Sequence, residues 1–166
     1  MNLRFQEYLV LFYRVFLVYI IYSICRLLFV YLNNDLVHVN SSEELIKLCY
    51  YGLRFDSAAI VYSNLLFILL SILPWGKTTY PGYQKLVCWI YFIFNGLFIS
   101  INFIDLAYYR FNLNRLMSNF LEVLKFESNK LVLLLHFTLD YFYLIILFLA
   151  LMYLWVYAYK KIKIYP

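Results

Sequence analysis

The residues of this chain best suited to chemistry form two short clusters of charged and aromatic side chains. One is Gly52-Leu53-Arg54-Phe55-Asp56, and the other runs from Asp105 through Tyr108 and Tyr109 to Arg110. The planar guanidinium fork of arginine matches phosphate and carboxylate oxygens, and tyrosine suits a boundary between apolar and aqueous surroundings. The clusters therefore predict binding of a phosphate-bearing group. The alternative is that they pair with one another and anchor helix ends at a membrane surface.

Four long apolar stretches must position these clusters. They cover residues 9–32, 57–76, 86–104 and 131–159, and the second and third contain no charged residue. About 20 apolar residues in a helix cross the ~30 Å hydrocarbon core of a bilayer. The chain has 166 residues, of which 66% are hydrophobic and 14% charged, and a soluble domain could not bury so much apolar surface. We therefore expect an all-α, polytopic integral membrane protein with a single transmembrane domain over residues 1–166.

Two of the connections should carry interfacial helices on the outer face. Ser41 and Glu44 have the spacing of a capping box before an amphipathic segment at 42–52. The second segment, 108–127, mixes aromatic and basic residues. Because a short hairpin joins spans two and three, both clusters should meet at the outer surface. The predicted headgroup site comprises Arg54, Arg110 and Arg115 as phosphate ligands, Tyr109 as a hydroxyl donor, and Asp56 and Asp105 as carboxylates that orient the guanidinium groups.

Charged residues also lie inside the predicted spans. Arg26 is roughly 9 Å from the outer end of span one, and Asp140 is roughly 13 Å from the outer end of span four, at 1.5 Å per residue. Ionisable residues at such depth are costly and usually pair inside the bundle, which predicts an Arg26–Asp140 pair. The alternative is that Arg26 snorkels outward and Asp140 is protonated. Arg14 is expected to snorkel to the inner surface near Glu7.

Several classes of function are disfavoured by the residues present. The formal charge of +5 is carried by the flanks of the spans rather than by one patch, so no nucleic-acid partner is expected. His38 and His136 are far apart, and Cys25, Cys49 and Cys88 are scattered, which encodes neither a metal site nor a disulfide framework. We therefore expect no catalytic residue, no metal and no cofactor in this chain. Phospholipid and the membrane are the expected partners.

The distribution of basic residues predicts the orientation. Lys160, Lys161 and Lys163 form a compact cluster directly after span four, and short basic clusters beside a span face the cytoplasm. Both the N-terminus and the C-terminus should therefore lie inside, with the two charged clusters outside.

Four short motifs in chain order carry a resemblance to a known family. They are Arg26-Leu27-Leu28-Phe29, Gly52-Leu53-Arg54-Phe55-Asp56, Asp105-x-x-Tyr108-Tyr109-Arg110 and Asn114-Arg115-Leu116. The chain resembles the N-terminal membrane domain of the lipoteichoic acid synthase family, particularly its sulfatase-like members from Bacteroidetes-type bacteria. The resemblance implies a cell-envelope protein of the bacterial inner membrane. It also implies an extracytoplasmic, metal-dependent catalytic domain that transfers phosphoglycerol or phosphoethanolamine.

That catalytic domain is not in this sequence, so the expected role is a lipid-headgroup-engaging membrane anchor that is not catalytic by itself. The chain is expected to be a membrane-domain fragment or a stand-alone relative without the enzyme half. Two alternatives stay open. One is a small transporter or channel subunit with Asp140, His136 and Arg26 along a polar path, and the other is a structural partner of a larger membrane complex.

Overall fold

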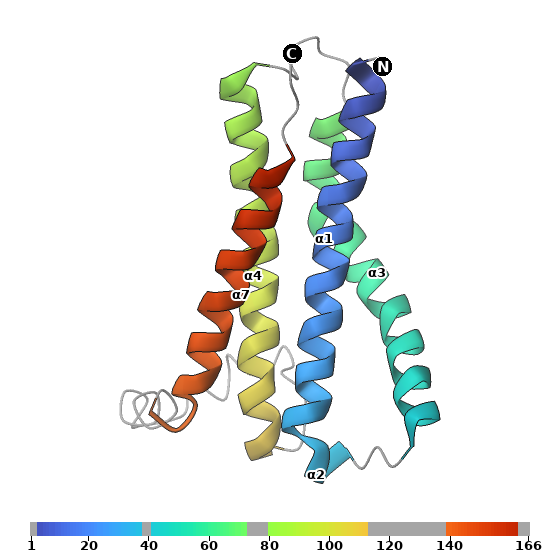
Figure 1. The fold of residues 1–166 in the computed structure, drawn as a ribbon, viewed down its shortest axis with the longest axis vertical. Coiled ribbons are helices and arrows are strands. Elements are labelled where there is room, and N and C mark those ends of the chain that lie inside the picture. The colour runs from blue at the N-terminus through green and yellow to red at the C-terminus, as the bar shows by residue number, and fades with distance from the viewer. Residues whose placement is uncertain (1–2, 38–40, 73–79, 113–138, 163–166) are drawn as a thin grey trace.

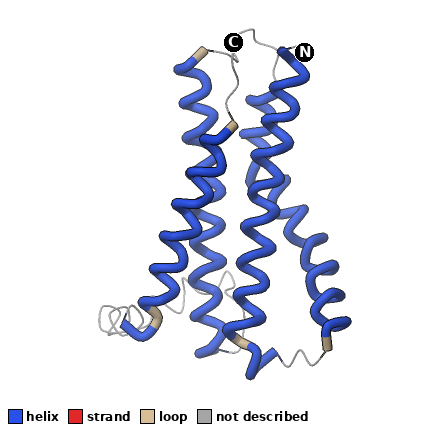
Figure 2. Tube along the Cα trace, viewed as in Figure 1, coloured by secondary structure: helices blue, strands red, loops and turns tan. Residues whose placement is uncertain are grey.

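The described residues form helices, and no strand occurs among them (Figures 1 and 2). The computed structural model describes residues 3–37, 41–72, 80–112 and 139–162. The helices are α1 (Leu3–Leu32), α2 (Asn34–Val37), α3 (Ser42–Ile72), α4 (Pro81–Asn112) and α7 (Phe142–Lys161). The predicted all-α fold is confirmed.

Four of these helices are long and apolar enough to cross a membrane, namely α1, α3, α4 and α7. At 1.5 Å per residue, the 20 residues of α7 extend roughly 30 Å, which matches a hydrocarbon core. Large apolar side chains cover the outside of the bundle, among them Phe12, Tyr62, Trp89 and Tyr153. Such a surface is suited to lipid rather than water. The chain is therefore a polytopic membrane protein.

The helices extend beyond the predicted apolar spans. Helix α1 begins at Leu3 rather than residue 9, and α4 extends past both ends of 86–104. Polar flanks continue a helix because each added residue closes one further backbone hydrogen bond. Pro81 starts α4, where its missing N–H costs nothing. Helix α7 begins at Phe142 rather than 131, and residues 131–138 lie outside the described part of the chain.

Helix α3 differs most from the prediction, because the expected interfacial segment 42–52 and span two form one helix of 31 residues. The Ser41 hydroxyl accepts a hydrogen bond from the Glu44 amide at 3.2 Å, as the capping motif predicts. The helix then continues through Gly52, and its first half diverges from α1 (Figure 1). In the other predicted interfacial segment, residues 108–112 belong to α4, and 113–127 are outside the described residues.

Helix α1 packs against the other three spanning helices. It begins at the same end of the bundle at which α7 ends, and we call this the termini end. The opposite end carries α2, and we call it the α2 end (Figure 1). The core between the helices contains the fully buried side chains Val18, Ile60, Phe67, Tyr91 and Ile99.

Candidate functional site

An ion pair joins α1 to α3 near the α2 end of the bundle. Arg26 donates from Nη2 to the Asp56 carboxylate at 2.6 Å and from Nη1 to the Cys49 carbonyl at 3.2 Å. The two side chains are only 12% and 19% exposed. The guanidinium lies so close to Gly52 that a Cβ there would overlap it. The observed position of the Arg26 guanidinium therefore requires glycine at residue 52 of α3.

This geometry differs from the predicted Arg26–Asp140 pair. Asp140 lies just before α7 and is exposed, whereas Asp56 lies on the helix that packs against α1 near Arg26. The prediction compared only depth along the helices, and it placed Asp56 just outside the predicted span 57–76. Arg26 pairs with Asp56 because α3 packs against α1 at this position.

A small cavity lies beside this ion pair, between α1, α3 and α4. Its volume is about 30 Å³, which is enough for one water-sized guest. It is too small for a phospholipid headgroup. The polar side chains that line it are Tyr22, Arg26, Asp56, Asn102 and Asp105.

The structure therefore brings two of the predicted site residues together. Asp56 and Asp105 line the same cavity, and the partner of Asp56 is Arg26. The prediction that Asp56 orients the Arg54 or Arg110 guanidinium differs from this geometry, because its carboxylate already receives the guanidinium of α1. Tyr109 packs its ring edge against Phe29, with ring centroids 4.9 Å apart.

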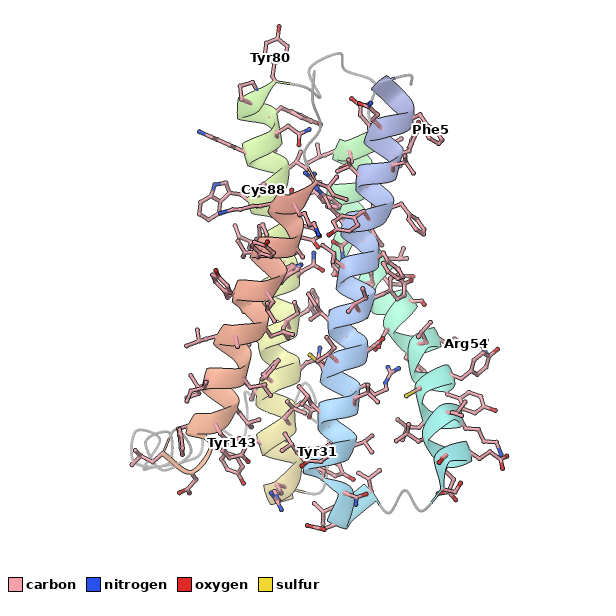
Figure 3. The ribbon with its side chains drawn as sticks, viewed as in Figure 1. Phe5, Tyr31, Arg54, Tyr80, Cys88 and Tyr143 are labelled. Atoms are coloured by element: carbon pink, nitrogen blue, oxygen red, sulfur yellow. The ribbon has the colours of Figure 1, made fainter. Side chains whose placement is uncertain are left out.

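Two of the three predicted phosphate ligands lie on exposed surfaces of different helices. Arg54 lies on the first half of α3 (Figure 3). Arg110 lies near the end of α4 and approaches Asp35 of α2 at 3.6 Å, with 43% of its side chain exposed. Tyr141 also lies near Arg110, and burial raises the pKa of the Tyr141 phenol above its usual value. Arg115 is outside the described residues.

Tyr22 and Asn102 are members of the cavity that sequence reasoning missed. A signal for both was present in helical spacing, since Tyr22 is four residues before Arg26 and Asn102 is three residues before Asp105. Residues three or four apart share one face of a helix. A polar residue at this distance from an intramembrane charge therefore marks the face that turns inward.

A second group of buried polar side chains lies nearer the termini end. Asn64 of α3 and Asn95 of α4 exchange hydrogen bonds of 2.8 and 2.6 Å, and neither is exposed. The Tyr91 hydroxyl donates to the Arg14 carbonyl at 2.9 Å and accepts from the Trp155 ring nitrogen at 2.9 Å. These bonds connect α1, α3, α4 and α7 through the core.

Arg14 belongs to this second group rather than to the surface. It was expected to snorkel, but its side chain is buried and its guanidinium carbon lies 4.2 Å from the centre of the Tyr159 ring. A cation over an aromatic face is stabilised by the ring quadrupole. A cavity of about 20 Å³ beside it is also lined by Glu7. The expected proximity to Glu7 is present, although the expected exposure is not.

Comparison of the chain with family models, with curated proteins and with solved structures found no match.

Proposed function

We propose that this chain is a membrane domain that binds anionic phospholipid headgroups at its α2 end and carries out no chemistry with its own residues. The observation that carries the proposal is that three arginines differ in burial and in pairing. Arg26 is held inside the bundle by Asp56, while Arg54 and Arg110 lie exposed at the border of the apolar spans. A headgroup phosphate is a suitable ligand for such guanidinium groups.

Arg54 has the surroundings of a headgroup ligand. It precedes the uncharged part of α3, which starts at residue 57, and Tyr50, Tyr51 and Phe55 around it are exposed aromatic side chains. Aromatic rings and arginine concentrate where lipid tails meet headgroups. Within the described ranges, with their gaps at 38–40, 73–79 and 113–138, no ion pair involves Arg54. Its fork can therefore turn toward lipid.

Arg110 has one weak ion pair among the described residues. Its contact with Asp35 is long at 3.6 Å, and the Asp35 side chain is 84% exposed. An exposed pair of this kind contributes about 0–1 kcal/mol. A phosphate that accepts two parallel N–H bonds is a stronger partner. A headgroup can therefore replace Asp35 at little cost.

The resemblance to the lipoteichoic acid synthase family supports a more specific role. We propose that the chain is the lipid-engaging part of a phosphoglycerol- or phosphoethanolamine-transferase-like protein in a bacterial inner membrane. The basic cluster Lys160, Lys161 and Lys163 supports an inside location for both termini. The α2 end would then face the outer leaflet, where an extracytoplasmic transferase domain would act.

Native mass spectrometry of the purified full chain with phosphatidylglycerol tests the proposal. We expect the parent to retain bound phosphatidylglycerol in preference to phosphatidylcholine. The double variant Arg54→Lys, Arg110→Lys keeps both charges but loses the bidentate fork, so it should retain less lipid while its helix content is unchanged.

A matched control removes two charges at the opposite end of the bundle. The variant Lys160→Gln, Lys161→Gln should retain phosphatidylglycerol as the parent does, whereas Arg54→Gln, Arg110→Gln should lose it. Equal loss of phosphatidylglycerol from the two Gln double variants would show that net charge alone attracts the lipid. The α2 end would then be only an interfacial anchor.

A further inference from the structure

We propose that Arg110 and Asp35 together bind a zwitterionic phospholipid headgroup in which a primary ammonium follows the phosphate, as in phosphatidylethanolamine. The phosphate would bind the Arg110 guanidinium, and the ammonium would bind the Asp35 carboxylate. This inference rests on the proposed function and assigns a headgroup class to one part of the same surface. We call the pair the Arg110–Asp35 site.

The two side chains approach each other without closing a hydrogen bond. Arg110 Nη2 lies 3.6 Å from Asp35 Oδ2, whereas charge-assisted hydrogen bonds between such groups measure about 2.7–2.9 Å. The Asp35 side chain is largely exposed, and the Arg110 side chain is partly exposed. The donors of the guanidinium and the acceptors of the carboxylate are therefore available to one ligand that contacts both.

The site lies at the level where the hydrocarbon core ends. Arg110 is in the last turn of α4, and Asp35 is in the first turn of α2. Tyr141 lies near Arg110 and directly precedes the spanning helix α7. Because the length of α7 matches a hydrocarbon core, its first residue marks the border between lipid tails and headgroups. A phospholipid presents its headgroup, not its tails, at this level.

The charges around Arg110 favour a headgroup that carries its own cation. A purely anionic headgroup on Arg110 would place its phosphate beside the Asp35 carboxylate, and like charges at such a distance repel each other. Asp140, which is also exposed, adjoins Tyr141 and adds a second carboxylate to this region. A zwitterionic headgroup aligned against the pair brings each of its charges to an opposite charge.

Hydrogen bonding then selects among zwitterionic headgroups. A primary ammonium has three N–H donors, which the Asp35 carboxylate can accept. The quaternary ammonium of choline has the same charge but no N–H donor. The Arg110–Asp35 site should therefore prefer ethanolamine to choline headgroups.

Arg54 has different surroundings, which suit an anionic headgroup. Of the acidic residues in α3, Asp56 pairs with Arg26. Glu43 and Glu44 lie roughly 15 Å or more from Arg54 along the helix. A phosphate on Arg54 therefore meets no carboxylate comparable to Asp35. The two exposed arginines of the α2 end thus differ in the headgroup that they favour.

Native mass spectrometry of the full chain tests the site with three lipids that have identical tails, namely phosphatidylethanolamine, its N,N-dimethyl derivative and phosphatidylcholine. Their headgroups share the phosphate and the positive charge and differ in the number of N–H donors. We expect the parent to retain phosphatidylethanolamine over phosphatidylcholine by about tenfold, with the dimethyl derivative between them. Asp35→Asn should remove this preference without lowering the retention of phosphatidylglycerol, because the amide neither holds the ammonium nor repels a phosphate.

Glu43→Gln is the matched control, since Glu43 is an exposed carboxylate in the first turn of α3, which begins at the α2 end (Figure 1). It should keep the parent's preference for phosphatidylethanolamine. Equal retention of phosphatidylethanolamine and phosphatidylcholine by the parent overturns the inference, as does an unchanged preference in Asp35→Asn. Both results can occur while phosphatidylglycerol retention still depends on Arg54 and Arg110, whereas loss of that dependence would overturn the proposed function itself.

A soluble headgroup separates a lipid ligand from a free phosphoamine. Glycerophosphoethanolamine has the same phosphate and ammonium but no tails, so it should bind the parent more weakly than phosphatidylethanolamine does. Binding as tight as that of the lipid would assign the Arg110–Asp35 site to a soluble phosphoamine and would overturn the assignment to a phospholipid.

Discussion

Arg26 of α1 and Asp56 of α3 are joined by a hydrogen-bonded ion pair of 2.6 Å. The pair is largely buried, and Gly52 provides the space for the guanidinium. Two charges in a bilayer-spanning bundle each cost several kcal/mol when alone, and this cost falls when they meet. The pair therefore holds the first half of α3 to the bundle.

Removal of either partner should destabilise the bundle strongly. We expect Asp56→Asn to lower the free energy of unfolding by about 3–5 kcal/mol, because the Arg26 charge is left without its carboxylate. Arg26→Gln should have a similar effect, and the double variant should lose less than the sum of the two. Unfolding in mixed micelles measures all three values.

Asp140→Asn is the control for this cycle, because Asp140 is exposed before α7. It should change stability by no more than about 0.5 kcal/mol. The opposite result would be a large loss of unfolding free energy in Asp140→Asn that is coupled to Arg26→Gln, and a small loss in Asp56→Asn. That result would favour the Arg26–Asp140 pair.

Gly52 should be intolerant of the smallest added side chain. A Cβ at this position would overlap the Arg26 guanidinium, so Gly52→Ala must displace Arg26 from Asp56 and should cost about 1–3 kcal/mol. Gly82→Ala and Gly96→Ala are matched controls, since a Cβ meets nothing within 4 Å at Gly82 and only Met152 at 3.8 Å at Gly96. Both controls should be neutral or stabilising, as alanine favours helix. Equal effects at all three positions, measured by thermal unfolding, would contradict the contact.

The sequence was sufficient to predict four apolar spans because span length and the absence of charge are local properties. The placement of Asp56 and Asp105 beside one cavity was also predictable, since the connection predicted at 77–85 is short and makes the two spans antiparallel neighbours. The continuity of α3 through Gly52 was not predictable in this way. Glycine usually weakens a helix, and only the packing of Arg26 explains its presence there.

The partner of Arg26 could not be chosen from sequence for a similar reason. Depth along a helix is read from residue number, but the direction in which a side chain points depends on which helices are neighbours. The depth argument left out Asp56, which precedes the predicted span 57–76, but the packing of α3 against α1 brings its carboxylate to Arg26. The same holds for Arg14, whose burial depends on the position of Tyr159 in α7.

The paired amides in the core should couple α3 to α4. Asn64→Ala and Asn95→Ala each leave the opposite amide without its partner, and each should cost about 1–2 kcal/mol. The double variant should lose less than the sum. Asn34→Ala, at an exposed position in α2, is the control and should be near neutral. Additive losses in the cycle would show that the two amides stabilise their own helices rather than the contact between them.

The orientation of the bundle can be tested separately from its packing. Helix α1 begins and α7 ends at the same end of the bundle (Figure 1), so reporters at these two positions should report the same side. The lysines that end α7, Lys160 and Lys161, predict that this side is the cytoplasm. We expect a green fluorescent protein fused after Lys161 to be fluorescent and an alkaline phosphatase fused there to be inactive, with the reverse result for insertions at Asn34 in α2. The variant Lys160→Gln, Lys161→Gln should weaken the preference of this end for the cytoplasm, because it removes the two charges that predict the orientation. An active phosphatase after Lys161 would place the α2 end, with Arg54 and Arg110, in the cytoplasm, and the headgroups bound there would then be those of the inner leaflet.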